Sequence, residues 1–144
     1  MVKKEKAVKK QVKEPPVLVG KNEALTESEN RVSRPAIMSQ LQDVPEPFEK
    51  TKSSYPHEYK DFEKLIPRRA GSESTSYHEY PVTQQQPYNF NTKPKQDPGH
   101  MRAVLNQNKQ YRGTISHNGE GDNPNGGPFS FDDKRRWQMR YMWG

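Results

Sequence analysis

The sequence predicts an α+β fold, with one α-helix packed on a central antiparallel β-sheet. Two observations lead to this prediction. The only stretch with clear helical spacing lies in the first third of the chain, and from Ser53 onward short extended runs alternate with Gly, Pro, Asn and Asp. One helix followed by an antiparallel sheet is an α+β arrangement.

Composition limits the size of the core. Ile, Leu, Val and Phe make up 22 of the 144 residues, whereas 14 residues are aromatic, and large rings bury more area each than aliphatic side chains. We therefore expect one domain of about 100 residues with a thin, aromatic-rich core. We assign this domain to residues 25–132, between a flexible basic arm or linker at 1–24 and a basic, aromatic C-terminal tail at 133–144.

The charge is concentrated at the N-terminus. Residues 1–14 hold six lysines and two glutamates, a net +4 of the chain's +6. Such an arm attracts polyanions such as RNA or an acidic membrane surface, although a solvated tail that aids solubility would look the same. The C-terminal tail interleaves cations with aromatic rings, a composition that suits the binding of single-stranded RNA. The alternative is that the tail folds back and covers the core.

Several protein classes are disfavoured. No apolar run approaches the roughly 18 residues that a membrane helix needs, so we expect a soluble protein without a membrane partner. The N-terminus has the charges of a signal peptide but lacks its apolar stretch, so either a signal has been removed or there was none. Without cysteine there is no disulfide framework and no thiolate zinc site.

The first elements are a short strand and a helix. Val17–Val19 could add an edge strand. Thr26 with Glu29 fits a capping box, and apolar residues follow at helical spacing, so we expect a helix within 26–42. Pro35 means that this helix is kinked or that it starts near Ser33.

The remaining elements are strands at about 77–82, 102–106, 111–117 and 128–131, with a turn at 106–109. Period-two alternation in the first of these places Glu79 on one face, and His78, Tyr80 and Val82 on the other. If the helix covers the Tyr80 face, Glu79 and Arg102 project together from the uncovered side.

Five side chains along these segments supply the chemistry of RNA cleavage. A carboxylate and two imidazoles serve proton transfer, and an arginine and a phenol serve a phosphate, without any metal. These candidates are Tyr55, His57, Glu79, Arg102 and His117. We expect His78 to point into the core and His100 to lie in a loop, and no spacing of ligands predicts a metal site.

The segments around these residues resemble the fungal guanyl-specific ribonucleases, the ribonuclease N/T family, in their order and nearly in their spacing. The resemblance covers about 54–131 and rests on Ser-Tyr-Pro-His-Glu-Tyr (54–59), Tyr-His-Glu-Tyr-Pro-Val (77–82), Arg-Ala-Val (102–104), Asn-Lys-Gln-Tyr-Arg-Gly (108–113) and Ile-Ser-His-Asn-Gly (115–119). The segment 88–99 also resembles the sarcin-type ribotoxins, relatives that cut one loop of ribosomal RNA. The fold implied by the resemblance agrees with the one predicted above.

The resemblance implies transesterification. Glu79 takes the proton of the ribose 2'-hydroxyl, which attacks phosphorus, and protonated His117 protonates the leaving 5'-oxygen. His57 is a second base or cationic stabiliser, Arg102 holds the nonbridging oxygens, and Tyr55 adds a hydrogen bond. A catalytic phenylalanine of the family has its candidate in Phe129, which lies farther from the last histidine than is usual.

Guanine recognition is implied for residues 59–63. Tyr59 and Phe62 would stack on the base, Glu63 would accept the guanine N1–H and amine, and backbone groups of Lys60 and Asp61 would complete the pocket. The family usually has asparagines at the two middle positions, and its members usually carry disulfides, so this chain departs from the pattern twice. Gly119, Gly121, Gly126 and Gly127 indicate a flexible loop and no phosphate cradle.

We therefore predict a metal-independent, cofactor-free endoribonuclease that cleaves single-stranded RNA after guanine, acts as a monomer and, by resemblance, is secreted or delivered into the cytoplasm of a target cell. Whether a proteinaceous inhibitor exists stays open. One alternative is a ribotoxin acting on ribosomal RNA, although the 22 positions from His57 to Glu79 are few for the long basic loop of those toxins. The other is a catalytically weak RNA-binding effector, which the retention of every catalytic residue type disfavours.

Overall fold

The computed structural model describes residues 16–61, 64–66 and 75–136. The basic arm at 1–14, the tail from 137 onward, and Phe62 and Glu63 of the predicted base pocket lie outside these ranges. None of the helices in the described part of the chain is long and apolar enough to cross a membrane.

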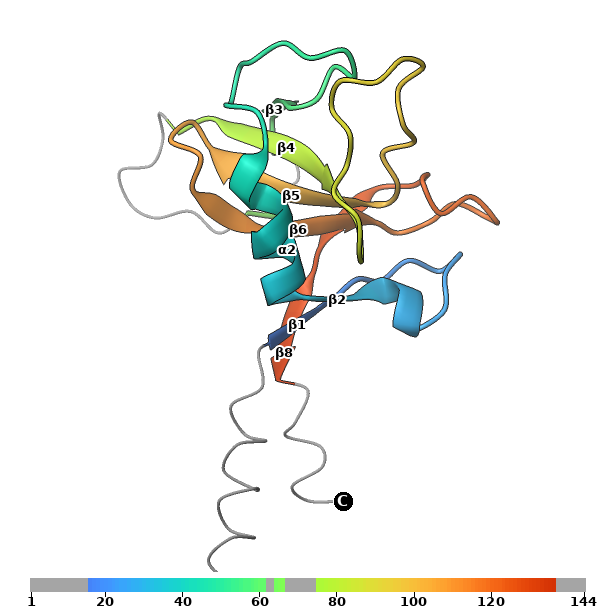
Figure 1. Cartoon of the computed structure of the whole chain (residues 1–144). Coiled ribbons are helices and arrows are strands. Elements are labelled where there is room, and N and C mark those ends of the chain that lie inside the picture. The colour runs from blue at the N-terminus through green and yellow to red at the C-terminus, as the bar shows by residue number, and fades with distance from the viewer. Residues whose placement is uncertain (1–15, 62–63, 67–74, 137–144) are drawn as a thin grey trace, which may run out of the picture.

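A five-stranded antiparallel sheet forms the centre of the domain (Figure 1). Its strand order is β3-β4-β5-β6-β7. The strands are β3 His57–Tyr59, β4 Tyr77–Val82, β5 Met101–Asn106, β6 Tyr111–His117 and β7 Phe129–Phe131. The predicted strands are thus confirmed within one residue at most ends, while the short strand β3 was not predicted.

A second, three-stranded sheet has the order β2-β1-β8. It consists of β1 Pro16–Val19, β2 Arg31–Ser33 and β8 Asp133–Arg136. The strand predicted at Val17–Val19 is confirmed, but its position at an edge is wrong, because β1 pairs with β2 on one side and β8 on the other. Segments that the sequence pattern placed in the arm and in the tail therefore pair with each other.

The predicted helix within 26–42 divides into separate elements. Thr26 and Glu29 do form a reciprocal capping box, with Thr26 N 2.9 Å from Glu29 Oε1 and Glu29 N 3.2 Å from Thr26 Oγ1. This box opens only the 3-10 turn η1 Ser28–Asn30, which β2 follows. Helix α2 Arg34–Gln40 then begins after Ser33, whose hydroxyl accepts the Ala36 N–H, so the alternative start near Ser33 is confirmed.

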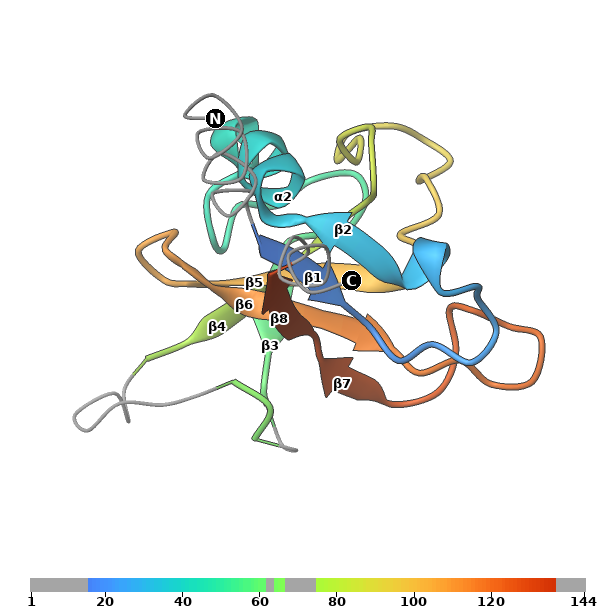
Figure 2. The same cartoon turned by 90° about the horizontal axis from the view of Figure 1, so that it is seen from below.

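Helix α2 packs on one side of the five-stranded sheet (Figure 2). Ile37 of the helix belongs to one buried hydrophobic cluster with Val82, Met101 and Ala103 of the sheet and with Leu18 and Val32. A second 3-10 turn, η2 Leu41–Asp43, continues the helix toward an aromatic cluster that includes Tyr80, Tyr88 and Phe90. With the helix on this face, the opposite face of β4 and β5 is left for polar side chains.

Candidate active site

The opposite face of the sheet brings the predicted catalytic side chains together. The register places His57 opposite Glu79 and His117 opposite Phe129. Glu79 and Arg102 are diagonal neighbours on β4 and β5, and Arg102 Nε lies 3.2 Å from Glu79 Oε1. The prediction that these two side chains leave the sheet together is therefore confirmed, but both are buried, with 7% and 4% exposed.

Arg102 is fixed on every side of its guanidinium group. Nη1 donates to the carbonyls of Pro98, Gly99 and Met101 at 3.0–3.2 Å, and Nη2 donates to the Tyr55 hydroxyl at 3.2 Å. The segment before β5 thus wraps its carbonyl groups around the cation. A guanidinium held in this way needs no reorganisation to meet a developing negative charge.

His57 lies at the other carboxylate oxygen of Glu79 and stacks on Tyr55. The two rings stack with centroids 4.6 Å apart, and the Arg102 guanidinium lies 5.3 Å from the Tyr55 centroid. His57 Nδ1 is 3.7 Å from Glu79 Oε2, an ion-pair distance too long for a hydrogen bond. His57 is half-exposed, so its imidazole reaches the carboxylate from the solvent side.

Burial raises the pKa of the Glu79 carboxyl above its ordinary value, while His57, Arg102 and His117 pull the pKa down. Burial is the largest of these effects because it disfavours the ionised form. A carboxyl group with a raised pKa is a stronger base when ionised, which suits the abstraction of a hydroxyl proton.

His117 is held by a backbone group. Its Nδ1 lies 2.8 Å from the carbonyl oxygen of Gly127, and a carbonyl only accepts, so Nδ1 carries a hydrogen and Nε2 is the nitrogen left for a substrate. The ring stacks on Phe129 with centroids 4.0 Å apart, and the Arg102 guanidinium lies 5.9 Å from the Phe129 centroid. Phe129 therefore packs against both His117 and Arg102.

The loop assigned to base recognition begins at this site. Tyr59 meets Phe129 edge-on at 6.3 Å between centroids, and Lys60 Nζ pairs with Glu58 at 3.0 Å. The buried Asp61 carboxylate accepts the N–H groups of Leu65 at 2.7 Å and Ile66 at 3.3 Å. The aspartate at this position thus folds the loop back on itself.

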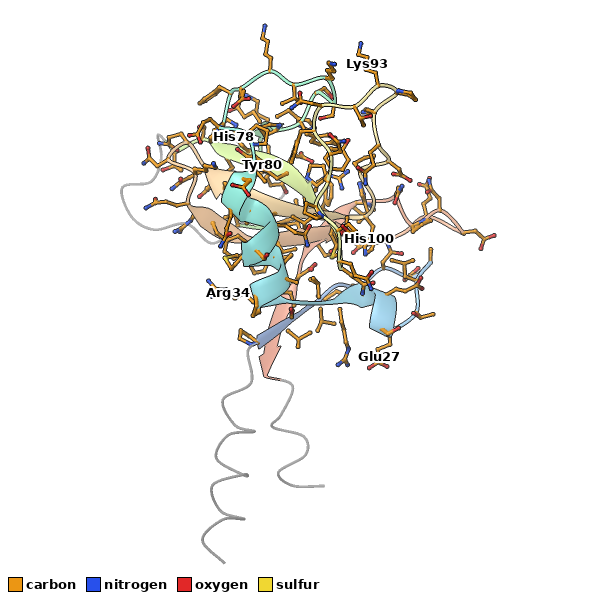
Figure 3. The ribbon with its side chains drawn as sticks, in the orientation of Figure 1. Glu27, Arg34, His78, Tyr80, Lys93 and His100 are labelled. Carbon is orange, nitrogen blue, oxygen red and sulfur yellow. The ribbon has the colours of Figure 1, made fainter. Side chains whose placement is uncertain are left out.

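The other two histidines are not among the predicted catalytic residues, although the His100 carbonyl accepts the His117 N–H at 2.8 Å. His78 is buried on the helix side of β4, where it bonds Ser76 Oγ at 3.0 Å, and desolvation lowers its pKa (Figure 3). His100 lies where the loop from β4 joins β5, and burial lowers its pKa as well. A cavity of about 280 Å³ between Arg34, Arg112 and Asp132 is lined by none of the catalytic side chains.

Sequence reasoning missed the backbone groups that hold the site. The carbonyls of Pro98, Gly99 and Gly127 have no residue signature, although the glycine-rich stretch marks where the last of them lies. Gly127 has φ +80°, and a Cβ there would meet the Gly119 carbonyl oxygen at 2.5 Å. The predicted flexible loop is therefore a closed turn that only glycine fits at this position.

Comparison with known proteins also indicates a ribonuclease. A model of the ribonuclease family matches residues 20–129. A protein of Arthroderma benhamiae named ribonuclease is 46% identical over 57 residues, which cover 38% of this chain and 36% of that protein. The match thus spans about a third of the relative's length.

Solved structures show the same fold. The ribotoxin restrictocin, determined with a 29-mer sarcin/ricin domain RNA analogue, gives a TM-score of 0.59 at 21% identity, covering 81% of this chain and 99% of restrictocin. The cytotoxic ribonuclease α-sarcin gives 0.60 at 18% identity, covering 83% and 99%. The α+β architecture of a helix on an antiparallel sheet is common to all three.

Proposed function

This chain belongs to the ribonuclease family, and we propose that it is a metal-independent endoribonuclease that cleaves single-stranded RNA after guanine. The observation that carries the proposal is the position of Glu79, whose carboxylate lies between Arg102 and His57 on the sheet face that also presents His117. A base, an acid and a fixed cation on one face are what cleavage at a ribose 2'-hydroxyl needs.

In the proposed first step, ionised Glu79 accepts the proton of the 2'-hydroxyl as its oxygen attacks phosphorus. His117 gives the proton on Nε2 to the departing 5'-oxygen, while Arg102 stabilises the charge that grows on the nonbridging oxygens. The product is a 2',3'-cyclic phosphate. Water opens this ring in the second step, with Glu79 as acid and His117 as base.

The mechanism is tested by incubating the protein with single-stranded RNA in EDTA and mapping the ends. We expect cleavage to persist and to leave 2',3'-cyclic or 3'-phosphate ends, because the acid, base and cation are all side chains. A magnesium-dependent nuclease in the same buffer controls for complete chelation. Loss of cleavage in EDTA, or 5'-phosphate products, would contradict the proposal.

Guanine preference is tested with the dinucleotides GpN and ApN. If Glu63 accepts the guanine N1–H and amine, Glu63→Ala should lower GpN cleavage roughly tens- to thousands-fold and leave slow ApN cleavage nearly unchanged. The matched control is Glu27→Ala, an exposed glutamate at the start of the 3-10 turn η1 (Figure 3). A GpN/ApN ratio that stays the same in Glu63→Ala would mean that the base pocket lies elsewhere.

A further inference from the structure

A buried amide lies directly behind His117. Asn22, in the loop between β1 and η1, has 3% of its surface exposed. Its Nδ2 group donates to the carbonyl of His117 at 2.9 Å and to the carbonyl of Pro124 at 2.7 Å. One side chain thus joins the end of strand β6 to the loop that follows it.

The Asn22 amide has no freedom to turn. Its Oδ1 accepts the Ala24 N–H at 2.9 Å, so the orientation that points Nδ2 at the two carbonyls is fixed. Its main chain is bonded in both directions to the Asn30 side chain, with Asn22 N to Asn30 Oδ1 at 2.8 Å and Asn30 Nδ2 to Asn22 O at 2.9 Å. Asn22 is therefore a rigid support with two donors aimed at the catalytic strand.

The supported loop is the one that orients the His117 ring. It closes through bonds from Asn118 N to Pro128 O at 2.8 Å and from Gly119 N to Gly126 O at 3.1 Å, and the next carbonyl, that of Gly127, accepts from His117 Nδ1. Asn22 holds this loop at Pro124 and holds the histidine itself at its carbonyl. A shift of the loop relative to the strand would break the 2.8 Å bond to the ring.

The packing around Asn22 leaves no space for the loop to be held differently. A Cβ at Gly119, where φ is +86°, would meet Asn22 Oδ1 at 2.6 Å. The neighbouring Glu23 N donates to the Asn118 carbonyl at 2.8 Å, which adds a second tie between the same two loops. The loop after β1 and the loop after β6 thus form one unit behind the acid.

We propose that Asn22 is a positioning residue for His117, which keeps Nε2 of the imidazole aimed at the leaving oxygen. The proposal rests on the role of His117 as the general acid in the proposed function. Because Asn22 acts through backbone groups, its loss should lower kcat with little effect on KM. Misplacing a catalytic group by a fraction of an ångström lowers rate far more than binding.

The test compares Asn22→Ala with Gln40→Ala. Gln40 is a matched control, since its buried amide also joins two backbone groups, with Nε2 2.6 Å from Thr83 O and Oε1 3.0 Å from Thr83 N, but it has no bond to His117. We expect Asn22→Ala to lower kcat on GpN on the order of tenfold at similar KM, and Gln40→Ala to keep the wild-type kcat at a temperature where both are folded.

Nitrogen NMR of the imidazoles gives a readout that does not depend on activity. In wild-type protein neutral His117 should be protonated at Nδ1, because that nitrogen donates to Gly127, and Asn22→Ala should mix the two tautomers.

If Asn22→Ala does not fold, Asn22→Asp carries the test, because it keeps the acceptor for Ala24 N and loses both donors. Wild-type kcat and an unchanged Nδ1–H tautomer in the Asn22 variant, or an equal loss of kcat in Gln40→Ala, would overturn the proposal. A wild-type protein that fails to cleave RNA would refute the proposed function alone, since the tautomer comparison still decides the role of Asn22.

Discussion

The proposed base, Glu79, and the proposed acid, His117, are held in different ways. Glu79 is surrounded by charged and polar side chains, since Arg102, His57 and, through Arg102, Tyr55 all act on its carboxylate. His117 is held by neutral groups, the Gly127 carbonyl at its ring and the Asn22 amide at its backbone. Burial and the neighbouring side chains together therefore set the charge of the Glu79 carboxyl, whereas the Gly127 carbonyl fixes only the orientation of the His117 ring.

The difference matters for stability because the Glu79–Arg102 pair is buried. Removing one partner of a buried ion pair leaves the other charge without compensation. Removing an imidazole that bonds one carbonyl leaves no charge behind. Substitution of Arg102 should thus change stability and rate together, whereas substitution of His117 should change mainly the rate.

The largest effect should come from Arg102→Met. It removes the cation that stabilises the transition state, so the rate should fall roughly a thousandfold, and it leaves Glu79 unpaired, so the free energy of unfolding at neutral pH should fall by about 3–5 kcal/mol. Denaturant titration and initial rates on GpN measure the two quantities. The stability loss should shrink at low pH, where Glu79 is protonated.

Ile37→Ala is the control for Arg102→Met. Ile37 is fully buried on the helix side of the sheet, so its truncation should cost about 2–5 kcal/mol of stability. At a temperature where the variant is folded, its rate should equal that of the wild type. Equal rate losses in both variants would show that stability, and not the cation, limits activity.

The next largest effect should come from His117→Ala, which leaves the Glu79–Arg102 pair in place. His117→Ala removes the proton donor for a poor leaving group, so the rate should fall on the order of a hundredfold or more. The unfolding midpoint in urea should change far less than in Arg102→Met. A large loss of stability would contradict the comparison between the two sides, and a rate close to wild type would rule out His117 as the acid.

A smaller effect concerns the pH dependence of stability. The folded-state pKa of Glu79 is raised, so the wild-type protein loses stability as the pH rises from the unfolded-state pKa through the folded one. Glu79→Gln lacks this loss, so its stability relative to wild type should rise with pH over the same range, on top of a pH-independent cost of leaving Arg102 unpaired. Its rate should fall less than that of His117→Ala if His57 takes over as base.

Urea titrations at several pH values on each side of the Glu79 pKa measure this difference. Glu27→Gln controls for the removal of one carboxylate, because Glu27 pairs with Arg31 at the surface. A stability difference between Glu79→Gln and wild type that stays constant with pH would show that burial does not disfavour the ionised carboxylate.

Much of the fold could be predicted because local pattern and tertiary structure agree there. The alternation in 77–82 and the turn at 106–109 appear as β4 and as the connection from β5 to β6, with Lys109 N bonded to Asn106 O at 2.9 Å. β3 was missed because it has only three residues after a proline, and its pairing with β4 is tertiary. The start of the helix was left open between Thr26 and Ser33 because the capping box, which usually marks a helix start, opens a 3-10 turn here.

The candidate site, like the fold, could be predicted only in part. Side chains that carry charge, such as Glu79, Arg102 and His117, could be predicted because their chemistry is visible in the sequence. The carbonyl of Gly127 and the donors of Asn22 could not, since any residue has a carbonyl and Asn22 is far from His117 along the chain. Interactions of this kind are visible only once the loops are folded.

The smallest expected effect is that of His57→Gln. It measures how far His57 lowers the pKa of the Glu79 carboxyl. His57 lowers the pKa of Glu79, so His57→Gln should raise that pKa further and move the acidic limb of the pH–rate profile to higher pH. The plateau rate should fall only modestly, because Glu79 remains as base. Glu58→Gln is the control on the same strand, since Glu58 is exposed and lies opposite His78 in the register. We expect its acidic limb to stay in place. An acidic limb that moves to lower pH in His57→Gln, or does not move, would mean that another group titrates there and that the base has been misassigned.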